Sequence, residues 1–217
     1  MNANGYTLIA NPFAEVGTGD TIGINDMFTD DSTNASSGTS AAASDNILVW
    51  TGSGYETYWY RKPKSGPAYW AKGNSQTTDT LPTGAGAFYL NSAKNTTELT
   101  MSGEVRTEPQ TITIAANGYT LVENPFPTPL NIQTFAVEGA TSGTSASASD
   151  NILVWTGNGY ETYWYRKPKS GPAYWAKGNS QTTDTIAPFT GFFYLSCGKS
   201  AFTVTIQPPS AASAVAP

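Results

Sequence analysis

The chain has no histidine, a single cysteine and few charged side chains. Without histidine it can form neither a Ser-His-Asp nor a Cys-His catalytic group, nor a histidine-ligated metal site. Cys197 alone cannot form an intrachain disulfide or a thiolate zinc cluster. No apolar run approaches the roughly 20 residues of a membrane-spanning helix. These absences argue against most enzymes, and we expect no catalytic residue, cofactor, metal site or membrane span.

Positive charge is also scarce. The 217 residues include 11 basic and 16 acidic side chains, which gives a net charge of −5. Nucleic-acid binding needs clustered basic charge, so this balance argues against a nucleic-acid partner. The first residues lack the basic and apolar regions of a signal peptide. The chain therefore either stays inside the cell or is a mature or trimmed form of an exported protein.

What the sequence does contain is a tandem repeat. Residues 44–80 and 149–185 agree at 36 of 37 positions, and the one difference is Asn158 in place of Ser53. The agreement runs through the polar turn KPKSGP, although core packing alone tolerates many exchanges at such positions. Two explanations stay open: a recent duplication, or two copies of one surface that meet one kind of partner.

The repeat extends beyond this identical block. NGYTLIANPF at 4–13 matches NGYTLVENPF at 117–126, and GAFYL at 86–90 matches GFFYL at 191–195. Between these matches the loops diverge. The boundary between the copies falls near residues 106–110, so we predict two domains, 1–106 and 107–217, the second with an Ala/Ser/Pro-rich C-terminal tail.

Local patterns are nearly all typical of β-strands. Two runs joined by Gly52-Ser53-Gly54 predict a hairpin over 46–62, because the second run, YETYWYRK, is rich in aromatic and β-favouring residues. Threonine alternating with apolar residues predicts half-buried strands at 98–105, 111–114 and 203–206. Short helical turns are expected at 22–28 and 130–135. The predicted fold class is all-β, with two tandem homologous antiparallel domains of sandwich or barrel-like type.

The order of these motifs resembles a repeat of large secreted proteins of Bacteroidetes and Verrucomicrobia. That repeat reads roughly G-[WY]-x-L-[IV]-x-NP-[FY]-P, then Y-x-W-x-x-x-x-x-Y, then I-x-P-x-x-[AG]-F-[FY]-[VL]. The matching residues of the second copy are Gly118, Tyr119, Leu121, Asn124, Pro125, Phe126, Pro127, Trp155, Tyr160, Tyr163, Ile186, Pro188, Gly191, Phe192 and Phe193. The first copy departs from the pattern with Ala87 where the second has Phe192. The resemblance implies a non-catalytic, exported β-module of surface or extracellular proteins.

Carboxylates recur in the identical block. Their spacing does not place any two across a cleft as glycoside hydrolysis requires, so we predict structural roles for them. They are Asp45, Glu56 and Asp79 in the first copy and Asp150, Glu161 and Asp184 in the second. A separate acidic loop before the first block lacks the spacing of a calcium-binding loop, and we interpret it as solvated.

Aromatic residues fall on both faces of the predicted hairpin. One face would pack the core, while the other is covered by a loop, forms a subunit interface, or stacks on sugars. These three alternatives stay open. The candidate interface or binding residues are Tyr58, Trp59, Tyr60, Arg61, Lys62, Lys64 and Trp70, with Tyr163, Trp164, Tyr165, Arg166, Lys167, Lys169 and Trp175 in the second copy.

The charges are unevenly distributed along the chain. Eight of the 11 basic residues lie in the identical blocks, whereas the acidic Glu15, Asp20, Asp26, Asp30 and Asp31 precede the first block. Patches of opposite sign can pair head to tail and steer association. The alternative is that these charges only keep a protein of low charge soluble.

A strand is expected before the second repeat but not before the first. Residues 107–115 lead into the second NGY motif, and almost nothing precedes the first. An unfilled sheet edge in the first domain would invite a strand from a neighbouring molecule. The candidate donor residues are Phe202, Val204, Ile206 and Val215. Alternatively, residues 111–114 complete the first domain, or an upstream strand has been cut away.

Taken together, these features predict a non-catalytic structural protein, a self-assembling homo-oligomer or polymer that forms an extracellular filament, fibre or surface layer. The alternative is a secreted or cell-surface adhesin or carbohydrate-binding module with a glycan as partner. Asn34 and Asn95 begin N-glycosylation sequons, which matter only in a host that uses them.

Overall fold

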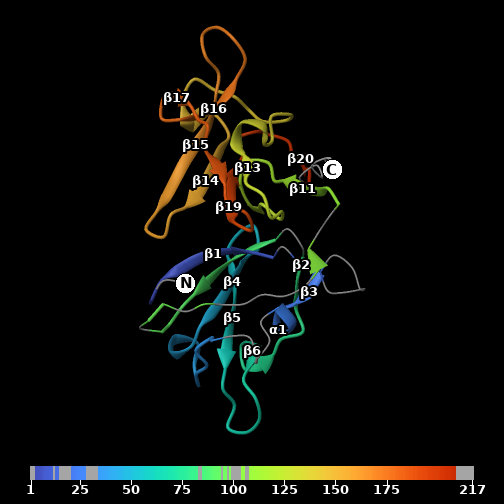
Figure 1. The fold of residues 1–217 in the computed structure, drawn as a ribbon, viewed down its shortest axis with the longest axis vertical. Helices are drawn as coiled ribbons and strands as arrows, with labels where there is room; N and C mark the ends of the chain where they lie inside the picture. Colours follow the sequence, from blue (N-terminus) through green and yellow to red (C-terminus); the bar gives the residue numbers. More distant parts are fainter. Residues whose placement is uncertain are drawn as a thin grey trace, which may run out of the picture.

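A computed structural model gives the fold of the chain. It describes residues 3–11, 13, 14, 21–27, 34–82, 85–93, 95, 96, 98, 104, 105 and 108–208. Two homologous all-β domains lie one above the other along the long axis (Figure 1). We call the N-terminal domain repeat 1 and the C-terminal domain repeat 2.

In its described part, repeat 1 forms a six-stranded sheet in the order β1-β9-β4-β5-β6-β7. Each neighbouring pair is antiparallel. The strands are β1 (Tyr6–Ala10), β4 (Asn46–Trp50), β5 (Tyr55–Arg61), β6 (Tyr69–Lys72), β7 (Ser75–Gln76) and β9 (Gly86–Leu90).

Repeat 2 builds an equivalent sheet in the order β12-β19-β14-β15-β16-β17 within the described residues, again antiparallel throughout. The strands are β12 (Tyr119–Glu123), β14 (Asn151–Trp155), β15 (Tyr160–Arg166), β16 (Tyr174–Lys177), β17 (Ser180–Gln181) and β19 (Gly191–Leu195). Because the strand order is the same, the identical block has the same fold in both copies.

The predicted hairpin is confirmed in both repeats. Trp50 pairs with Tyr55, and Thr51 closes the turn by donating its N–H to the Gly54 carbonyl at 2.9 Å. Gly52 adopts a φ of 94°, a backbone region that favours glycine. In the NGY motif, by contrast, it is the asparagine that turns the chain, since Asn4 and Asn117 have φ of 47° and 46°.

Four small ladders complete the described part of the fold. In repeat 1, β2 (Phe13–Ala14) pairs with β10 (Glu104–Val105), and β3 (Thr21–Gly23) pairs with β8 (Thr80–Pro82). In repeat 2, β13 (Leu130–Asn131) pairs with β18 (Thr185–Ile186), and β11 (Gln110–Ile114) pairs with β20 (Phe202–Ile206). The predicted strand at 98–105 is described only at Glu98, which lies outside any strand, and at its last two residues in β10.

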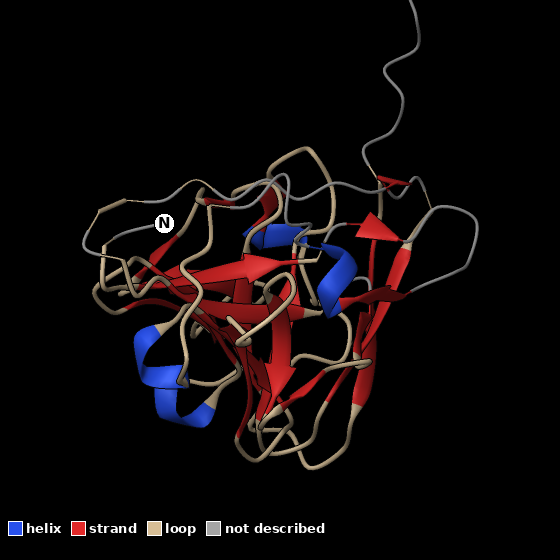
Figure 2. Ribbon diagram, turned by 90° about the horizontal axis from the view of Figure 1, so that it is seen from below, coloured by secondary structure: helices blue, strands red, loops and turns tan. Residues whose placement is uncertain are grey.

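Among the residues that the structure describes, helical structure consists of single turns beside the sheets (Figure 2). The two predicted turns are confirmed as α1 (Ile24–Met27) and η2 (Ile132–Thr134). Two further short turns precede the hairpins, η1 (Ala41–Ala43) and η3 (Ala146–Ala148).

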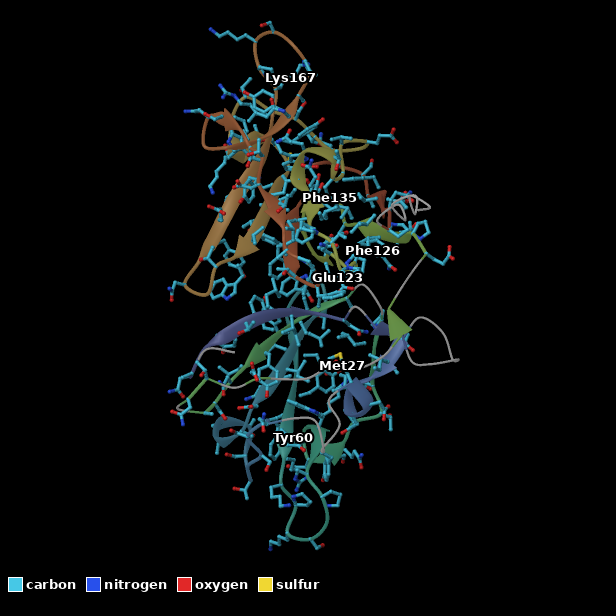
Figure 3. All side chains as sticks on the ribbon, viewed as in Figure 1. Met27, Tyr60, Glu123, Phe126, Phe135 and Lys167 are labelled. Atoms are coloured by element: carbon cyan, nitrogen blue, oxygen red, sulfur yellow. The ribbon has the colours of Figure 1, made fainter. Side chains whose placement is uncertain are left out.

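Each repeat has its own apolar core on one face of its six-stranded sheet. In repeat 1 this core contains Tyr58, Tyr60 and Trp70, closed over by Met27 of α1. In repeat 2, Phe126 and Phe135 lie among the strands (Figure 3) and belong to the corresponding core. The opposite faces of the two sheets meet each other in the middle of the molecule, where Leu8, Phe88 and Phe193 are buried together.

Candidate functional site

The aromatic rows of the hairpin are interior. Tyr58, Trp59, Tyr60 and Trp70 are 4%, 7%, 6% and 0% exposed, so they form no free aromatic surface. Their equivalents Tyr163, Trp164, Tyr165 and Trp175 are buried in the same way. These particular rings are therefore not the exposed Trp/Tyr rows that the adhesin alternative requires.

Trp59 is buried by contacts within its own repeat. The segment before each hairpin pairs with the end of β5, where Gly38 donates its N–H to the Tyr60 carbonyl and its carbonyl accepts from the N–H of Lys62. The indole of Trp59 donates to the Gly73 carbonyl at 2.7 Å. This end of the face is therefore covered within repeat 1, as the loop alternative predicts, whereas its other end, at Tyr55, borders repeat 2.

The basic residues at the end of the hairpin have two different roles. The guanidinium of Arg61 donates to the Asn74 carbonyl and lies over the Trp59 ring, 5.7 Å from its centroid. Arg166 repeats this arrangement over Trp164. Lys62, Lys64, Lys167 and Lys169 are exposed, and in the described part of the chain no carboxylate forms an ion pair with them.

These four lysines lie on two loops of identical sequence, 62–67 and 167–172, which we call the end loops. The end loops connect β5 to β6 and β15 to β16, and they project from opposite ends of the long axis (Figure 1). Lys167, at the start of one of them, is labelled in Figure 3.

The first end loop borders a hollow of about 590 Å³. Asp26 lines it together with Pro63, Ser65 and Tyr69. Asp26 and the uncharged residues of the end loop therefore border the same hollow. Glu15, Asp20, Asp30 and Asp31, the other acids of the predicted acidic patch, lie outside the described residues.

A carboxylate–lysine cluster stabilises the sheet between β5 and β6. Lys72 lies 2.8 Å from Glu56 and 2.9 Å from Asp79. The hydrogen bonds from Lys72 and from Tyr58 lower the pKa of Asp79, and the hydrogen bonds to Glu56 and to Asp79 raise the pKa of Lys72. Lys177, Glu161 and Asp184 repeat the cluster. Internal ion pairing of this kind agrees with the predicted structural role.

The other block carboxylate is fully buried in each repeat. Asp150 accepts hydrogen bonds from the Tyr194 hydroxyl at 2.7 Å and from the backbone N–H groups of Thr141 and Cys197 at 3.0 and 2.8 Å. Asp45 accepts the equivalent bonds from Tyr89, Ser36 and Ser92. These aspartates tie three segments together, which confirms the structural role predicted for them.

The proposed strand donor is already paired inside its own domain. Phe202, Val204 and Ile206 lie in β20, opposite Ile114, Ile112 and Gln110 of β11. Val204 and Ile206 are buried in the core of repeat 2. In this structure the segment is therefore not a free strand, and 111–114 completes repeat 2 rather than the first domain. Val215 lies outside the described residues.

The two repeats meet through an aromatic cluster whose contacts are reciprocal. The indole of Trp50 donates to the Tyr119 carbonyl at 3.3 Å, and the indole of Trp155 donates to the Tyr6 carbonyl at 3.1 Å. Each bond is the repeat equivalent of the other. A contact in which each partner uses the same surface is the arrangement found in two-fold symmetric dimers.

Eight rings form this aromatic cluster. Phe88 and Phe193 lie at its centre, 6.2 Å apart, and every other ring makes an edge-to-face contact with one of them at about 6 Å. The members are Tyr6, Trp50, Tyr55 and Phe88 of repeat 1 and Tyr119, Trp155, Tyr160 and Phe193 of repeat 2.

Two glycines allow the sheets to approach this closely. A Cβ on Gly86 would lie 2.9 Å from the side chain of Leu121, and a Cβ on Gly191 would lie 3.0 Å from that of Leu8. These glycines are equivalent positions of the GxFYL motif. Glycine at this motif position is therefore explained by the contact between repeats rather than by backbone conformation.

The aromatic cluster leaves two hollows on the surface, of about 260 and 330 Å³. Their linings correspond residue by residue under the repeat. The Trp50 hollow is lined by Trp50, Tyr55, Tyr119, Leu153, Tyr160 and Phe193. The Trp155 hollow is lined by Trp155, Tyr160, Tyr6, Leu48, Tyr55 and Phe88.

Sequence reasoning did not single out this site. The signal was present in the alternation of the strands: in GAFYL and GFFYL the third residue points away from the core, opposite the fourth. Tyr89 and Tyr194 enter the repeat cores, whereas Phe88 and Phe193 enter the contact between repeats.

Within the described ranges there is no helix long and apolar enough to span a bilayer, and no group of three His, Cys, Asp or Glu side chains suited to hold a metal. Comparison of the chain with protein-family models, with curated proteins and with solved structures found no match. The resemblance to the secreted repeat therefore rests on the sequence motifs alone.

Proposed function

We propose that this protein is a non-catalytic, extracellular structural subunit that links copies of itself through its two end loops. The observation that carries this proposal is the placement of two identical exposed basic loops at opposite ends of one body (Figure 1). A molecule with the same surface at both ends can engage two partners at once, which is the minimum requirement for a linear or layered assembly.

The charge distribution favours another copy of the chain as the partner. Outside the two identical blocks the chain has ten acidic and three basic residues, so most of the remaining charge is opposite in sign to the end loops. Each surface ion pair contributes only about 0–1 kcal/mol, so the lysines would orient the contact while the uncharged residues of the end loops pack against the partner.

The contact between the repeats also supports linkage through the end loops. It fixes the end loops in opposite directions, since both sheets use their second face for it. Without that contact two copies on a flexible linker would present their loops in variable directions.

The test measures assembly of the native chain and of its variants by sedimentation velocity and by negative-stain electron microscopy. The variants are Lys62→Ser/Lys64→Ser at one end, Lys167→Ser/Lys169→Ser at the other, and all four together. We expect fewer contacts when either pair is removed and monomers when all four lysines are removed. Lys199→Ser removes one exposed lysine elsewhere and should leave assembly unchanged.

Salt provides a second measurement. The screening length falls from about 10 Å at 0.1 M to about 3 Å at 1 M ionic strength, so assembly should weaken over that range. Polymers that are unchanged in the four-lysine variant would reject the end loops as the linking surface.

A further inference from the structure

Exposed aromatic surface is concentrated in one place on this molecule. Among the described residues the large hydrophobic side chains that are strongly exposed are Val137 and four tyrosines. Tyr6, Tyr55, Tyr119 and Tyr160 are 44%, 44%, 45% and 42% exposed, and all four belong to the aromatic cluster between the repeats. A gathered set of half-exposed rings marks an interaction site, whereas single scattered ones do not.

The two hollows are neighbours that share a wall. Tyr55 and Tyr160 line both of them. Each hollow then adds one Trp, one Phe, one Leu and one further Tyr, and each of these residues has its repeat equivalent in the other hollow. Two chemically equivalent hollows side by side suit a ligand made of repeated units better than a single compact molecule.

The lining chemistry restricts the units further. No charged side chain lines either hollow. The indole N–H groups of Trp50 and Trp155 are already bonded to backbone carbonyls. The side-chain polar groups left to a ligand are therefore the tyrosine hydroxyls, for which no protein partner is present in the described part of the chain.

The phenols of Tyr55 and Tyr160, which line both hollows, are neutral donors and acceptors. Burial raises the pKa of Tyr55 and of Tyr160, and the neighbouring Tyr55 and Tyr119 raise that of Tyr160 further. At physiological pH the site therefore offers aromatic faces and neutral hydroxyls, with no charge of its own. Both features match a molecule that has apolar C–H faces and hydroxyl edges.

We propose that the aromatic cluster binds a neutral oligosaccharide, with one sugar ring in the Trp50 hollow and another in the Trp155 hollow. The C–H face of each ring packs on Tyr55 or Tyr160, and the sugar hydroxyls pair with the tyrosine hydroxyls around the rim. The two linings correspond with the repeats exchanged, so a linear saccharide would meet the two hollows in opposite directions. Stacking on an aromatic face does not depend on the direction of the saccharide, so one ligand can occupy both hollows. This site lies between the repeats and is separate from the end loops.

The test is isothermal titration calorimetry of the full chain with neutral hexasaccharides of glucose, mannose, xylose and N-acetylglucosamine, together with the matching monosaccharides. We expect at least one hexasaccharide to bind with a Kd below about 1 mM and its monosaccharide to bind much more weakly, because only the longer ligand reaches both hollows. Binding should be insensitive to salt, unlike assembly through the end loops.

Variants assign the site. Tyr55→Ala and Tyr160→Ala should each weaken binding about tenfold, and the double variant should lose it, since each ring serves both hollows. Tyr55→Phe keeps the ring and should lose less. Tyr174→Ala removes a half-buried tyrosine outside the aromatic cluster and is the matched control. Circular dichroism verifies that each variant is folded.

Three results would overturn the proposal. One is the absence of binding to any of these saccharides at about 1 mM. Another is binding that survives in the Tyr55→Ala/Tyr160→Ala double variant, which places the sugar elsewhere. The third is binding of a proline-rich peptide to the same tyrosines when none of the saccharides binds, which assigns the aromatic cluster to a peptide instead.

Discussion

In repeat 1 the carbonyl groups of Trp70 and Thr77 accept hydrogen bonds from Asn25, whereas in repeat 2 the equivalent carbonyls of Trp175 and Thr182 accept from Gln133. Asn25 lies on an α-helical turn and Gln133 on a 3-10 turn, in loops of different length and sequence. The edge of an identical sheet thus requires an amide at this place, and two unrelated loops supply it.

The comparison extends to the core. Phe192 of repeat 2 is fully buried and lies against Phe135, with ring centroids 5.3 Å apart. At the equivalent positions repeat 1 has Ala87, also fully buried, in a core that contains Met27. The loop above each sheet has therefore changed together with the strand residue below it, while the block between them stayed constant.

The largest effect is expected from exchanging these core residues. Phe192→Ala should lower the free energy of unfolding by about 3–5 kcal/mol, because the cavity it leaves is lined by the rigid rings of repeat 2. Ala87→Phe should cost about 1–3 kcal/mol in repeat 1 through overpacking. Urea unfolding of each variant measures both. A neutral Ala87→Phe would indicate that the two cores are closer in shape than the side chains suggest.

Substitutions at the contact between the repeats should have similar effects in the two copies. Gly86→Ala and Gly191→Ala should each destabilise the chain by about 1–2 kcal/mol, since the added methyl meets a leucine across the contact. Gly191→Ala should cost at least as much, because the Ile9 carbonyl lies 3.2 Å from the new atom.

Gly54→Ala and Gly159→Ala are the controls for this experiment. No atom lies within 4 Å of a Cβ at either position, so the unfolding temperature of these variants should be unchanged or slightly raised. Equal losses at all four glycines would show that backbone entropy, rather than the contact between repeats, determines the effect.

A smaller difference concerns the buried aspartates. Ser92 donates both its N–H and its hydroxyl to Asp45 at 2.7 Å, whereas the equivalent Cys197 offers Asp150 an N–H and only a weakly donating thiol. Cys197→Ser should therefore stabilise repeat 2 by about 1 kcal/mol, and Ser92→Cys should destabilise repeat 1 by a similar amount. Thermal unfolding of the pair checks the sign.

The half-buried position of Cys197 also has a chemical consequence. Desolvation raises the pKa of its thiol, and Asp150 raises it further. Its reaction with a thiol reagent at neutral pH should consequently be slower than that of free cysteine.

The smallest expected effect is on stability in acid. Hydrogen bonds from Lys177 and Tyr163 lower the pKa of Asp184 below its usual 3.8, and Lys177 likewise lowers that of Glu161 below 4.5. Carboxylates with a lowered folded-state pKa stabilise the fold above the unfolded-state pKa, and this stability is lost as the pH falls through the folded value. The loss should begin near pH 4 and remain modest, since both side chains are more than a third exposed, at 37% and 38%.

Asp79→Asn and Asp184→Asn each remove one carboxylate from these clusters. In a plot of unfolding free energy against pH, both variants should have a smaller slope below about pH 4 and an unchanged slope near neutral pH. A variant with an unaltered acid limb would place the acid sensitivity at other carboxylates.

The sequence by itself determined the two hairpins, the strands β11 and β20, the two short helical turns and the duplication. Each depends on local chemistry: Gly52 for the turn, threonine alternating with apolar residues for β11 and β20, and a repeated block that must fold alike twice. It also indicated the structural role of Asp45 and Asp150, because their place before a strand suits a turn.

The aromatic cluster, the burial of Trp59 and the pairing of β20 with β11 were decided only by the tertiary structure. Alternation shows that Phe88 and Phe193 point to the second face of their sheets, but whether that face meets water, a loop or the other repeat depends on how two folded sheets pack. A sheet with two apolar faces has to cover both, and in this chain the second repeat is what covers the second face of the first.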